Sequence, residues 1–198
     1  MTDLNIKIRE ANPEDAAALA VLINFAGEGL PLYLWETMAD AGEDPWEVGR
    51  RRAQREKGSF SYRNTVIAEI DATVAGCLIG YPLADDPEPI DLAEMPAMFV
   101  PLQELEILAS GTWYINVVAA FPEFRGSGIG TVMLAAAERF AAQTDKDRLS
   151  LIVTDANLGA RRLYERNGYR EIAQRPLVKE QWDCESQNWV LMIKDMKD

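Results

Sequence analysis

A glycine-rich stretch past the middle of the chain, Arg125-Gly-Ser-Gly128-Ile-Gly130, joins a strand-like segment to a helix-forming one. Residues 114–120 are mostly apolar and β-branched, and the residues after Gly130 have helical spacing. A loop that enters a helix in this way presents unpaired backbone N–H groups and the positive end of the helix dipole. Glycines also let a diphosphate approach the backbone without Cβ clashes. The stretch therefore predicts a phosphate-binding loop.

Two common nucleotide loops do not fit this stretch. The P-loop places a Lys and a Ser or Thr after its last glycine, whereas Thr131 and Val132 follow Gly130 here. The dinucleotide fingerprint G-x-G-x-x-G, begun at Gly126, would need a third glycine where Thr131 stands. A nucleotide-binding domain is therefore disfavoured.

A second segment downstream of the loop has the pattern of a short helix. It runs Asn157-Leu-Gly-Ala160-Arg-Arg-Leu163-Tyr164-Glu-Arg-Asn-Gly168-Tyr169. Ala160, Leu163 and Tyr164 fall on one face of a helix, and Gly168 stands where a glycine ends a helix in a left-handed conformation. Residues 149–153, between the two segments, predict a buried strand.

The first segment resembles the signature [Gln/Arg]-x-x-Gly-x-[Gly/Ala] of the GNAT acetyltransferase superfamily. The second resembles that superfamily's Asn-x-x-Ala-x-x-x-Tyr-x-x-x-Gly-[Phe/Tyr]. Together with the strand between them, the resemblance covers residues 113–170. It implies an α/β fold of the GNAT type, in which helices flank a mixed, mostly antiparallel central sheet that is splayed at the cofactor strand. We expect residues 1–198 to form a single domain of this type.

The resemblance also implies acetyl-coenzyme A as cosubstrate. In the family the loop amides hold the pyrophosphate, and the backbone of the preceding strand pairs with the pantetheine amides. Asn157 is implied to bind the pantetheine region, although a simple helix N-cap explains it equally well. The implied cofactor-binding residues are Val118, Ala120, Arg125, Gly126, Ser127, Gly128, Ile129, Gly130 and Asn157.

Tyr164 is the expected catalytic residue. In acetyl transfer the coenzyme A thiolate leaves and must be stabilised or protonated, and a phenol with a pKa of about 10 can donate at neutral pH. The matching Tyr of the family is placed for this role; the alternative is an aromatic ring that packs the last helical turn.

An alkylammonium acceptor must also lose a proton. The candidates, Glu69, Glu104 and Glu106, with Tyr114 and Asn116 to orient water, remain open.

Composition limits the chemistry. The chain has no His, so it has no imidazole base, no Ser-His triad and no His-ligated metal, and we expect no metal site. A net charge of −12 argues against nucleic-acid binding. No apolar run is long enough to span a bilayer, and the first residues do not have the pattern of a signal peptide. With only Cys77 and Cys184, we expect a cytoplasmic protein without a disulfide framework.

The flanking segments follow simple patterns. We expect a strand at residues 6–9, a helix from Asn12-Pro13 to Gly27 and Gly29, and a helical region over residues 30–57 that ends in a solvated basic run. A hairpin is expected at residues 65–70 and 73–81, and a short helix near Ile107 within the insertion 82–110. Residues 169–173 and 189–194 predict closing strands.

The resulting hypothesis is an N-acetyltransferase that moves an acetyl group to a primary amine by direct attack in a ternary complex, because no covalent nucleophile is placed. The alternatives are a non-catalytic acyl-coenzyme-A-binding module and a transferase of longer acyl chains. The expected partner is a small-molecule or peptide amine, with no nucleic acid and no membrane, and a homodimer is left open. Residues 26–63 and 82–110 are expected to determine the acceptor.

Overall fold

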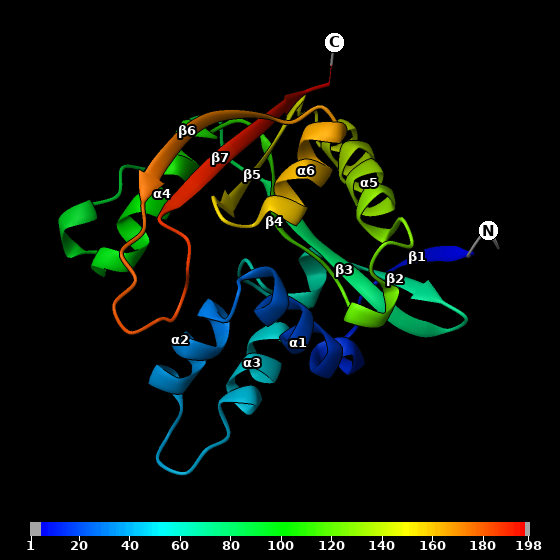
Figure 1. Cartoon of the computed structure of the whole chain (residues 1–198), viewed down its shortest axis with the longest axis horizontal. Coiled ribbons are helices and arrows are strands. Elements are labelled where there is room, and N and C mark those ends of the chain that lie inside the picture. Colours follow the sequence, from blue (N-terminus) through cyan, green and yellow to red (C-terminus); the bar gives the residue numbers. More distant parts are fainter. Residues whose placement is uncertain (1–4, 197–198) are drawn as a thin grey trace. The chain divides into compact units, whose positions relative to one another are not determined.

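The computed structural model describes residues 5–196, which form a mixed α/β fold. Seven strands join in one open sheet in the hydrogen-bonded order β1-β2-β3-β4-β5-β7-β6, with helices beside it (Figure 1). The sheet is mostly antiparallel, as expected, because only β4 and β5 are registered as a parallel pair among the described strands. The chain divides into two compact units, one with the residues up to Gly80 and Asn116–Met133, the other with Tyr81–Ile115 and the residues from Leu134 on. That the whole chain acts as a single domain stays a prediction.

The first unit is built around an antiparallel hairpin. Strands β1 (Ile6–Glu10), β2 (Thr65–Ile70) and β3 (Thr73–Pro82) pair in sequence order. The turn between β2 and β3 has φ of 50° at Asp71 and 60° at Ala72, the positive values of a tight two-residue hairpin loop. The predicted hairpin is therefore confirmed.

Three helices pack on this unit, α1 (Ala16–Ala26), α2 (Leu30–Met38) and α3 (Pro45–Ala53). The chain enters α1 through a short 3-10 turn, Pro13–Asp15, which the Asn12 side chain caps as predicted. The expected helical region over residues 30–57 is divided in two, because a loop that contains Gly42 (φ +85°) separates α2 from α3. One apolar core contains α1 residues, Trp35, Val48, Ile67, Cys77, Ile79, Val117 and Ala119.

The second unit contains the parallel pair and the C-terminal strands. Helix α4 (Val100–Leu108) precedes β4 (Trp113–Ala120), and α5 (Ile129–Gln143) precedes β5 (Arg148–Thr154). Helix α6 (Leu158–Arg166) leads to β6 (Arg170–Pro176), and β7 (Asn188–Asp195) pairs antiparallel with both β5 and β6. Helix α4 packs against β6 and β7. The short helix near Ile107 and both closing strands are thus confirmed.

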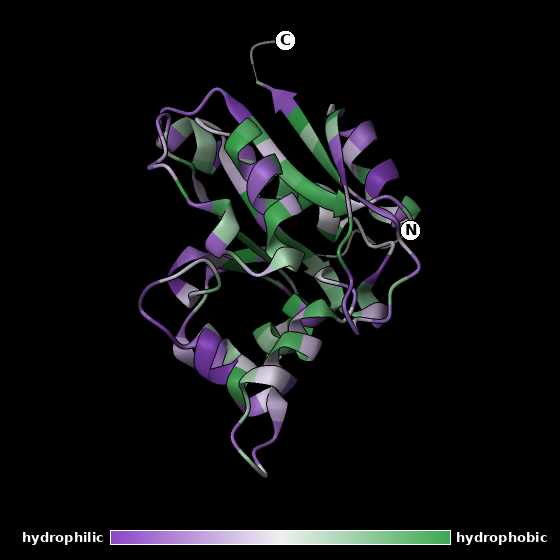
Figure 2. Ribbon diagram, turned by 90° about the vertical axis from the view of Figure 1, so that its left-hand side faces the viewer, coloured by the Kyte–Doolittle hydropathy of each residue, from purple (hydrophilic) through white to green (hydrophobic). Residues whose placement is uncertain are grey.

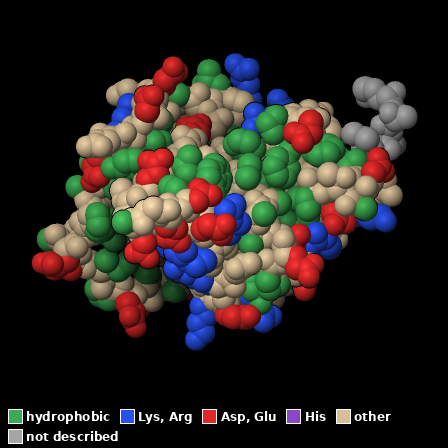
Figure 3. Space-filling model, turned by 90° about the horizontal axis from the view of Figure 1, so that it is seen from below, with side chains coloured by type: hydrophobic (Ala, Val, Ile, Leu, Met, Phe, Trp, Pro, Cys, Tyr) green, Lys and Arg blue, Asp and Glu red, His purple; other side chains and the backbone are tan. Residues whose placement is uncertain are grey.

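Hydropathy explains which strands are interior. Five consecutive residues of β7, from Trp189 to Ile193, are buried, whereas the edge strand β6 has no buried residue. In Figure 2 the strand that leads to the C-terminus, β7, is accordingly coloured mostly as apolar, with a polar end. On the face shown in Figure 3, acidic side chains are scattered among basic ones.

Among residues 5–196 no single helix is long and apolar enough to cross a membrane. One pair of helical segments, Pro13–Ala26 and Leu30–Met38, bent by 120° at the break between them, is together long and apolar enough by length and composition alone.

Candidate active site

The glycine loop has the backbone conformation of an anion site. Gly126 has φ of +78° and Gly128 of +93°, a left-handed conformation that glycine adopts without steric cost. A Cβ atom added at either position would meet no atom within 4 Å, so packing does not demand these glycines. The loop is exposed, and α5 begins directly after it at Ile129.

The backbone amides of this loop are available to a ligand. Within residues 5–196, the N–H groups of Gly126, Gly128, Ile129, Gly130 and Thr131 have no hydrogen-bond partner. Consecutive unpaired N–H groups at a helix start attract an anion, and the helix dipole adds to that attraction. The loop can therefore hold a phosphate or diphosphate, the ligand that the sequence predicted.

The other loop side chains stabilise the turn. The Ser127 hydroxyl and N–H both donate to the Phe124 carbonyl, at 2.5 and 3.4 Å, and the Ile129 side chain is buried, so Ile129 can offer a ligand only its backbone N–H. The Arg125 guanidinium lies 5.6 Å from the centre of the Phe25 ring and donates to the Ala120 carbonyl at 3.4 Å. A phosphate contact by the Arg125 side chain would require it to leave this position.

Gly76 of β3 supports the loop, and the sequence prediction missed it. A Cβ atom there would lie 2.5 Å from the Ala119 carbonyl oxygen and 3.0 Å from the Cγ2 atom of Ile129. Such a contact with backbone cannot be relieved by a side-chain movement. Glycine thus lets β3, β4 and the first turn of α5 approach closely. A glycine inside a strand pattern is the sequence signal for such an approach.

Strand β4 is the predicted cofactor strand. Val117 and Ala119 are buried in the core of the first unit, whereas Val118 and Ala120 lie half-buried on the opposite face. The parallel register between β4 and β5 covers only Trp113–Ile115 and Leu149–Leu151. This register ends at Ile115. That the backbone near Val118 and Ala120 pairs with a pantetheine amide stays a prediction.

Helix α6 is held at both ends by side chains and backbone of the second motif. The side-chain Oδ1 of Asn157 accepts from the Ala160 N–H at 3.2 Å, so the N-cap interpretation is confirmed. Gly168 has φ of +88°, and the N–H groups of Gly168 and Tyr169 donate to the carbonyls of Glu165 and Tyr164. This is a complete Schellman C-cap. A contact of Asn157 with the cofactor stays a prediction.

Tyr164 is buried in the second unit and its ring packs on that of Tyr169, with centres 5.9 Å apart. Burial raises the pKa of Tyr164 to about 12, so its hydroxyl is protonated at neutral pH. Within the described residues, this hydroxyl has no hydrogen-bond partner, but it is not fully enclosed, whereas that of Tyr169 is both fully enclosed and unpartnered. Tyr164 can therefore donate to a ligand, and Tyr169 cannot reach one.

The three carboxylate candidates differ in their surroundings. Glu69 pairs with Arg9 at 2.7 Å, and Glu104 pairs with Arg175 at 2.5 Å. The Glu106 carboxylate, in contrast, has no hydrogen bond or ion pair with any of residues 5–196. Burial raises its pKa. The pKa of Tyr114 is raised well above its usual value by burial, and then by the charges of Glu106, Tyr81 and Tyr164. Asn116 is half-buried in the first unit.

The Cys77 thiol is not activated for covalent catalysis. Cys77 is fully buried, and burial raises its pKa to about 12, so it stays a neutral thiol at physiological pH. Residues 5–196 contain no group of three or more Cys, Asp or Glu side chains that could hold a metal ion.

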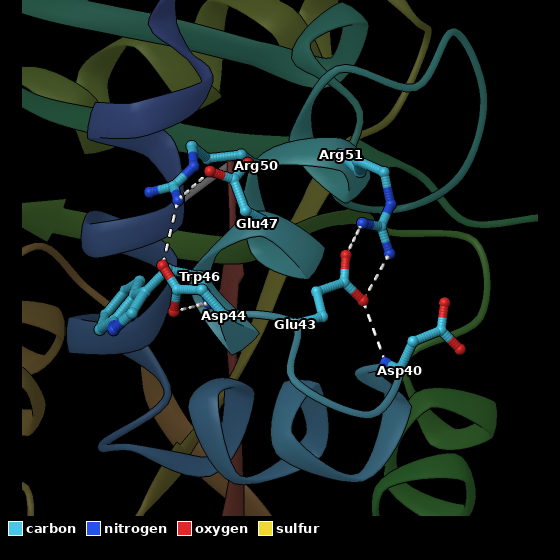
Figure 4. A network of polar contacts seen from close by, with 7 residues as sticks. All are labelled: Asp40, Glu43, Asp44, Trp46, Glu47, Arg50 and Arg51. Carbon is cyan, nitrogen blue, oxygen red and sulfur yellow. Dashed lines mark hydrogen bonds and ion pairs between the residues drawn. The ribbon is translucent and has the colours of Figure 1, made fainter.

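The loop between α2 and α3, in the segment expected to meet the acceptor, is tied to α3 by ion pairs (Figure 4). Glu43 pairs with Arg51 and accepts from the Asp40 N–H, whereas Asp44 caps α3 by accepting from the Trp46 N–H at 3.1 Å. The Arg50 guanidinium bridges Asp44 at 3.3 Å and Glu47 at 2.6 Å. Arg50 and Arg51, at the start of the basic run, are therefore ion-paired on a largely solvated helix face, as predicted for this run.

Comparison with known proteins identifies a family. A sequence profile described as the acetyltransferase (GNAT) family matches residues 32–169, more than half of the chain. No curated protein matches the sequence.

Solved structures share the fold. The chain is similar to a structure described as an acetyltransferase, with 22% identity, a TM-score of 0.65 and coverage of 96% of this chain and 100% of that one. An N-acetyltransferase from Staphylococcus aureus Mu50 has 21% identity, a TM-score of 0.62 and coverage of 94% and 99%. A chain of the NatC complex bound to Gag peptide and CoA has 16% identity, a TM-score of 0.57 and coverage of 96% and 98%.

Proposed function

The chain belongs to the GNAT acetyltransferase family, and from that premise we propose that it transfers an acetyl group from acetyl-coenzyme A to a primary amine. Acyl transfer from an acyl-coenzyme A is the activity that membership of the family supports; the acetyl group and the amine acceptor are our proposal. The observation that carries it is the loop at the start of α5, whose five unpartnered N–H groups suit a diphosphate. One related structure, the NatC complex, is described as bound to CoA.

In the proposed complex the free amides of Gly126, Gly128, Ile129, Gly130 and Thr131 hold the pyrophosphate, and the backbone of β4 near Val118 and Ala120 pairs with the pantetheine. The amine attacks the thioester carbonyl directly, which accords with the neutral, buried state of Cys77. Tyr164 donates its hydroxyl proton, or a strong hydrogen bond, to the leaving thiolate. Its unpartnered hydroxyl supports this role.

A thermal scan tests the cosubstrate. Acetyl-coenzyme A at about 100 times its dissociation constant should stabilise the fold by roughly 2.7 kcal/mol, which raises the melting temperature by about 5–11 °C for a chain of this size. ATP and NAD serve as controls and should give no shift. An unchanged melting temperature with saturating acetyl-coenzyme A would remove the cosubstrate assignment.

Two further assays separate the alternatives. A non-catalytic acyl-coenzyme-A-binding module would show the thermal shift but no thiol release with any of a panel of polyamines, amino acids, aminoglycosides and peptides. A transferase of longer acyl chains would prefer a longer thioester when acyl-coenzymes A of increasing length are compared. We propose the cytoplasm as the site of action.

A further inference from the structure

The ring of Phe25 on α1 lies beside the glycine loop, and the side chain of Arg125 lies over it. The Cζ atom of Arg125 is 5.6 Å from the centre of the ring, and its Nε–H group donates to the Ala120 carbonyl at 3.4 Å. In the described part of the chain, the Arg125 guanidinium forms no ion pair with a carboxylate. All three residues belong to the first unit. An aromatic ring is thus a main partner of a cation that stands next to the anion site.

Phe25 is held in place by contacts that do not involve Arg125. It stands in the last turn of α1, where its carbonyl accepts from the Glu28 N–H at 3.3 Å. Its ring meets that of Phe121 edge-on, with centres 6.3 Å apart and planes at 88°. Phe121 is fixed in turn, because its N–H donates to the Ala75 carbonyl of β3 at 2.9 Å. The Phe25 ring is therefore a fixed surface beside the loop.

Arg125, in contrast, can move. Its side chain is exposed, and it is followed by Gly126, whose Cβ position has no atom within 4 Å. The Phe25 ring is itself 38% exposed, and a cation over an exposed ring is held weakly. The bond to the Ala120 carbonyl is longer than an ordinary N–H···O bond. A hydrogen bond between a guanidinium and a phosphate joins opposite charges and is stronger than either contact, so a diphosphate on the loop amides draws Arg125 off the ring.

We propose that Phe25 is a positioning residue for the cosubstrate: its ring holds Arg125 away from the phosphates, and the diphosphate of acetyl-coenzyme A takes Arg125 from the ring as it binds. The ring then lowers the affinity for acetyl-coenzyme A, because binding must break this contact. Coenzyme A, the product, has the same diphosphate, so the return of Arg125 to Phe25 favours its release. This inference rests on the proposed cosubstrate, and it gives a role to an α1 side chain outside the loop motif.

Calorimetric titration with acetyl-coenzyme A compares Phe25→Leu with Phe25→Trp. Leucine removes the π face and keeps an apolar side chain, whereas a Trp ring attracts a cation more strongly than a Phe ring does. Competition by the ring shifts the affinity of the two variants in opposite directions, whereas damage to the loop weakens binding in both. Phe60→Leu is the matched control, because Phe60 is another partly buried ring of the first unit and, in the part of the chain that the structure describes, no guanidinium lies over it.

We expect Phe25→Leu to bind acetyl-coenzyme A about 2- to 5-fold more tightly than the wild type and Phe25→Trp about 2-fold more weakly, the range of a cation–π contact at an exposed site. Free coenzyme A should follow the same order. Phe60→Leu should bind like the wild type, and melting curves check that each variant is folded.

The same substitution in a second background isolates the contact. Arg125→Gln should bind acetyl-coenzyme A at least about tenfold more weakly, because a charge-assisted hydrogen bond to phosphate is lost. In that background Phe25→Leu should change the affinity by less than about 1.5-fold, since the ring no longer has a guanidinium to hold.

An affinity that is unchanged or lower in Phe25→Leu would overturn the inference. A gain that persists in the Arg125→Gln background would overturn it too, and so would wild-type affinity in Arg125→Gln, because Arg125 would then not meet the phosphates. A wild type that binds acetyl-coenzyme A with no response to Phe25 refutes this inference alone and leaves the cosubstrate standing, whereas a wild type that does not bind it refutes both. If Phe25→Leu does not fold, Phe25→Met takes its place under the same criteria.

Discussion

Replacement of Tyr164 by Phe removes one hydroxyl and keeps a buried ring against Tyr169. Among residues 5–196 that hydroxyl has no hydrogen-bond partner, so its removal strands no protein donor or acceptor. We therefore expect the free energy of unfolding to change by less than about 1 kcal/mol, which is at most about 4 °C in melting temperature.

The effect of this substitution on turnover should be far larger. The Tyr164 pKa of about 12 keeps the phenol protonated throughout the physiological range, and a thiolate with a pKa of about 8.5 is the group that needs its proton or hydrogen bond. Loss of such a donor lowers turnover by about 10²–10⁴-fold, or about 2.7–5.4 kcal/mol of transition-state stabilisation. In the wild type, ionisation of Tyr164 should cause no fall in turnover below about pH 11.

Tyr169→Phe is the matched control, because the same hydroxyl is deleted from the neighbouring ring. The Tyr169 hydroxyl is enclosed without a partner, so its removal should leave stability unchanged or raise it by about 1 kcal/mol, and turnover should not change. Steady-state kinetics and melting curves on both variants decide the matter. Wild-type turnover in Tyr164→Phe refutes a chemical role for Tyr164, unless product release limits the rate, and a pre-steady-state burst would reveal that case.

Other substitutions test the remaining parts of the account. Gly128→Val strains a backbone with φ of +93°, but no atom lies within 4 Å of its Cβ position, so the protein should still fold. It should bind acetyl-coenzyme A at least about tenfold more weakly by calorimetry, because the side chain fills the anion site and the strain disturbs the loop; unchanged affinity would place the pyrophosphate elsewhere. Gly159→Ala, equally open but in α6, should keep full affinity and gain up to about 1 kcal/mol. Gly76→Ala should cost about 1–3 kcal/mol in urea unfolding, because its Cβ would lie 2.5 Å from the Ala119 carbonyl, and a neutral result would contradict the close approach of β3 and β4. Asp15→Asn should cost about 1–2 kcal/mol at pH 7, because Arg9 donates to both carboxylate oxygens at 2.8 Å and lowers the pKa of Asp15. That stabilisation exists above the ordinary carboxyl pKa of about 3.9 and disappears as the pH falls through the lower folded value, so the difference in stability between the two proteins should shrink as the solution is acidified below that ordinary pKa.

Most elements of the fold follow from local sequence signals. The Asp71-Ala72 turn, the Asn12 cap and Gly168 each determine a boundary through contacts within a few residues, and the structure has all three. The division of residues 30–57 was not predicted, because Gly42 and the Asp44 cap stand inside a segment whose apolar spacing looks continuously helical.

The candidate site was predictable where one segment forms it, and not where distant segments meet. The loop and its glycines are contiguous, so their conformation could be anticipated from residues 125–130. The choice among Glu69, Glu104 and Glu106 depends on ion pairs with Arg9 and Arg175, which lie 60 and 71 residues away from their partners. No local pattern indicates that Glu106 is left unpaired.

The measurement that tests the central claim most directly is wild-type turnover with acetyl-coenzyme A and a panel of primary amines, followed by mass spectrometry of the amine and by thiol release. The account predicts an acetylated amine that forms in a one-to-one ratio with free coenzyme A, and only when enzyme, thioester and amine are all present. A protein that binds acetyl-coenzyme A but yields no acetylated amine across the panel, or releases thiol without acetylating the amine, would contradict it.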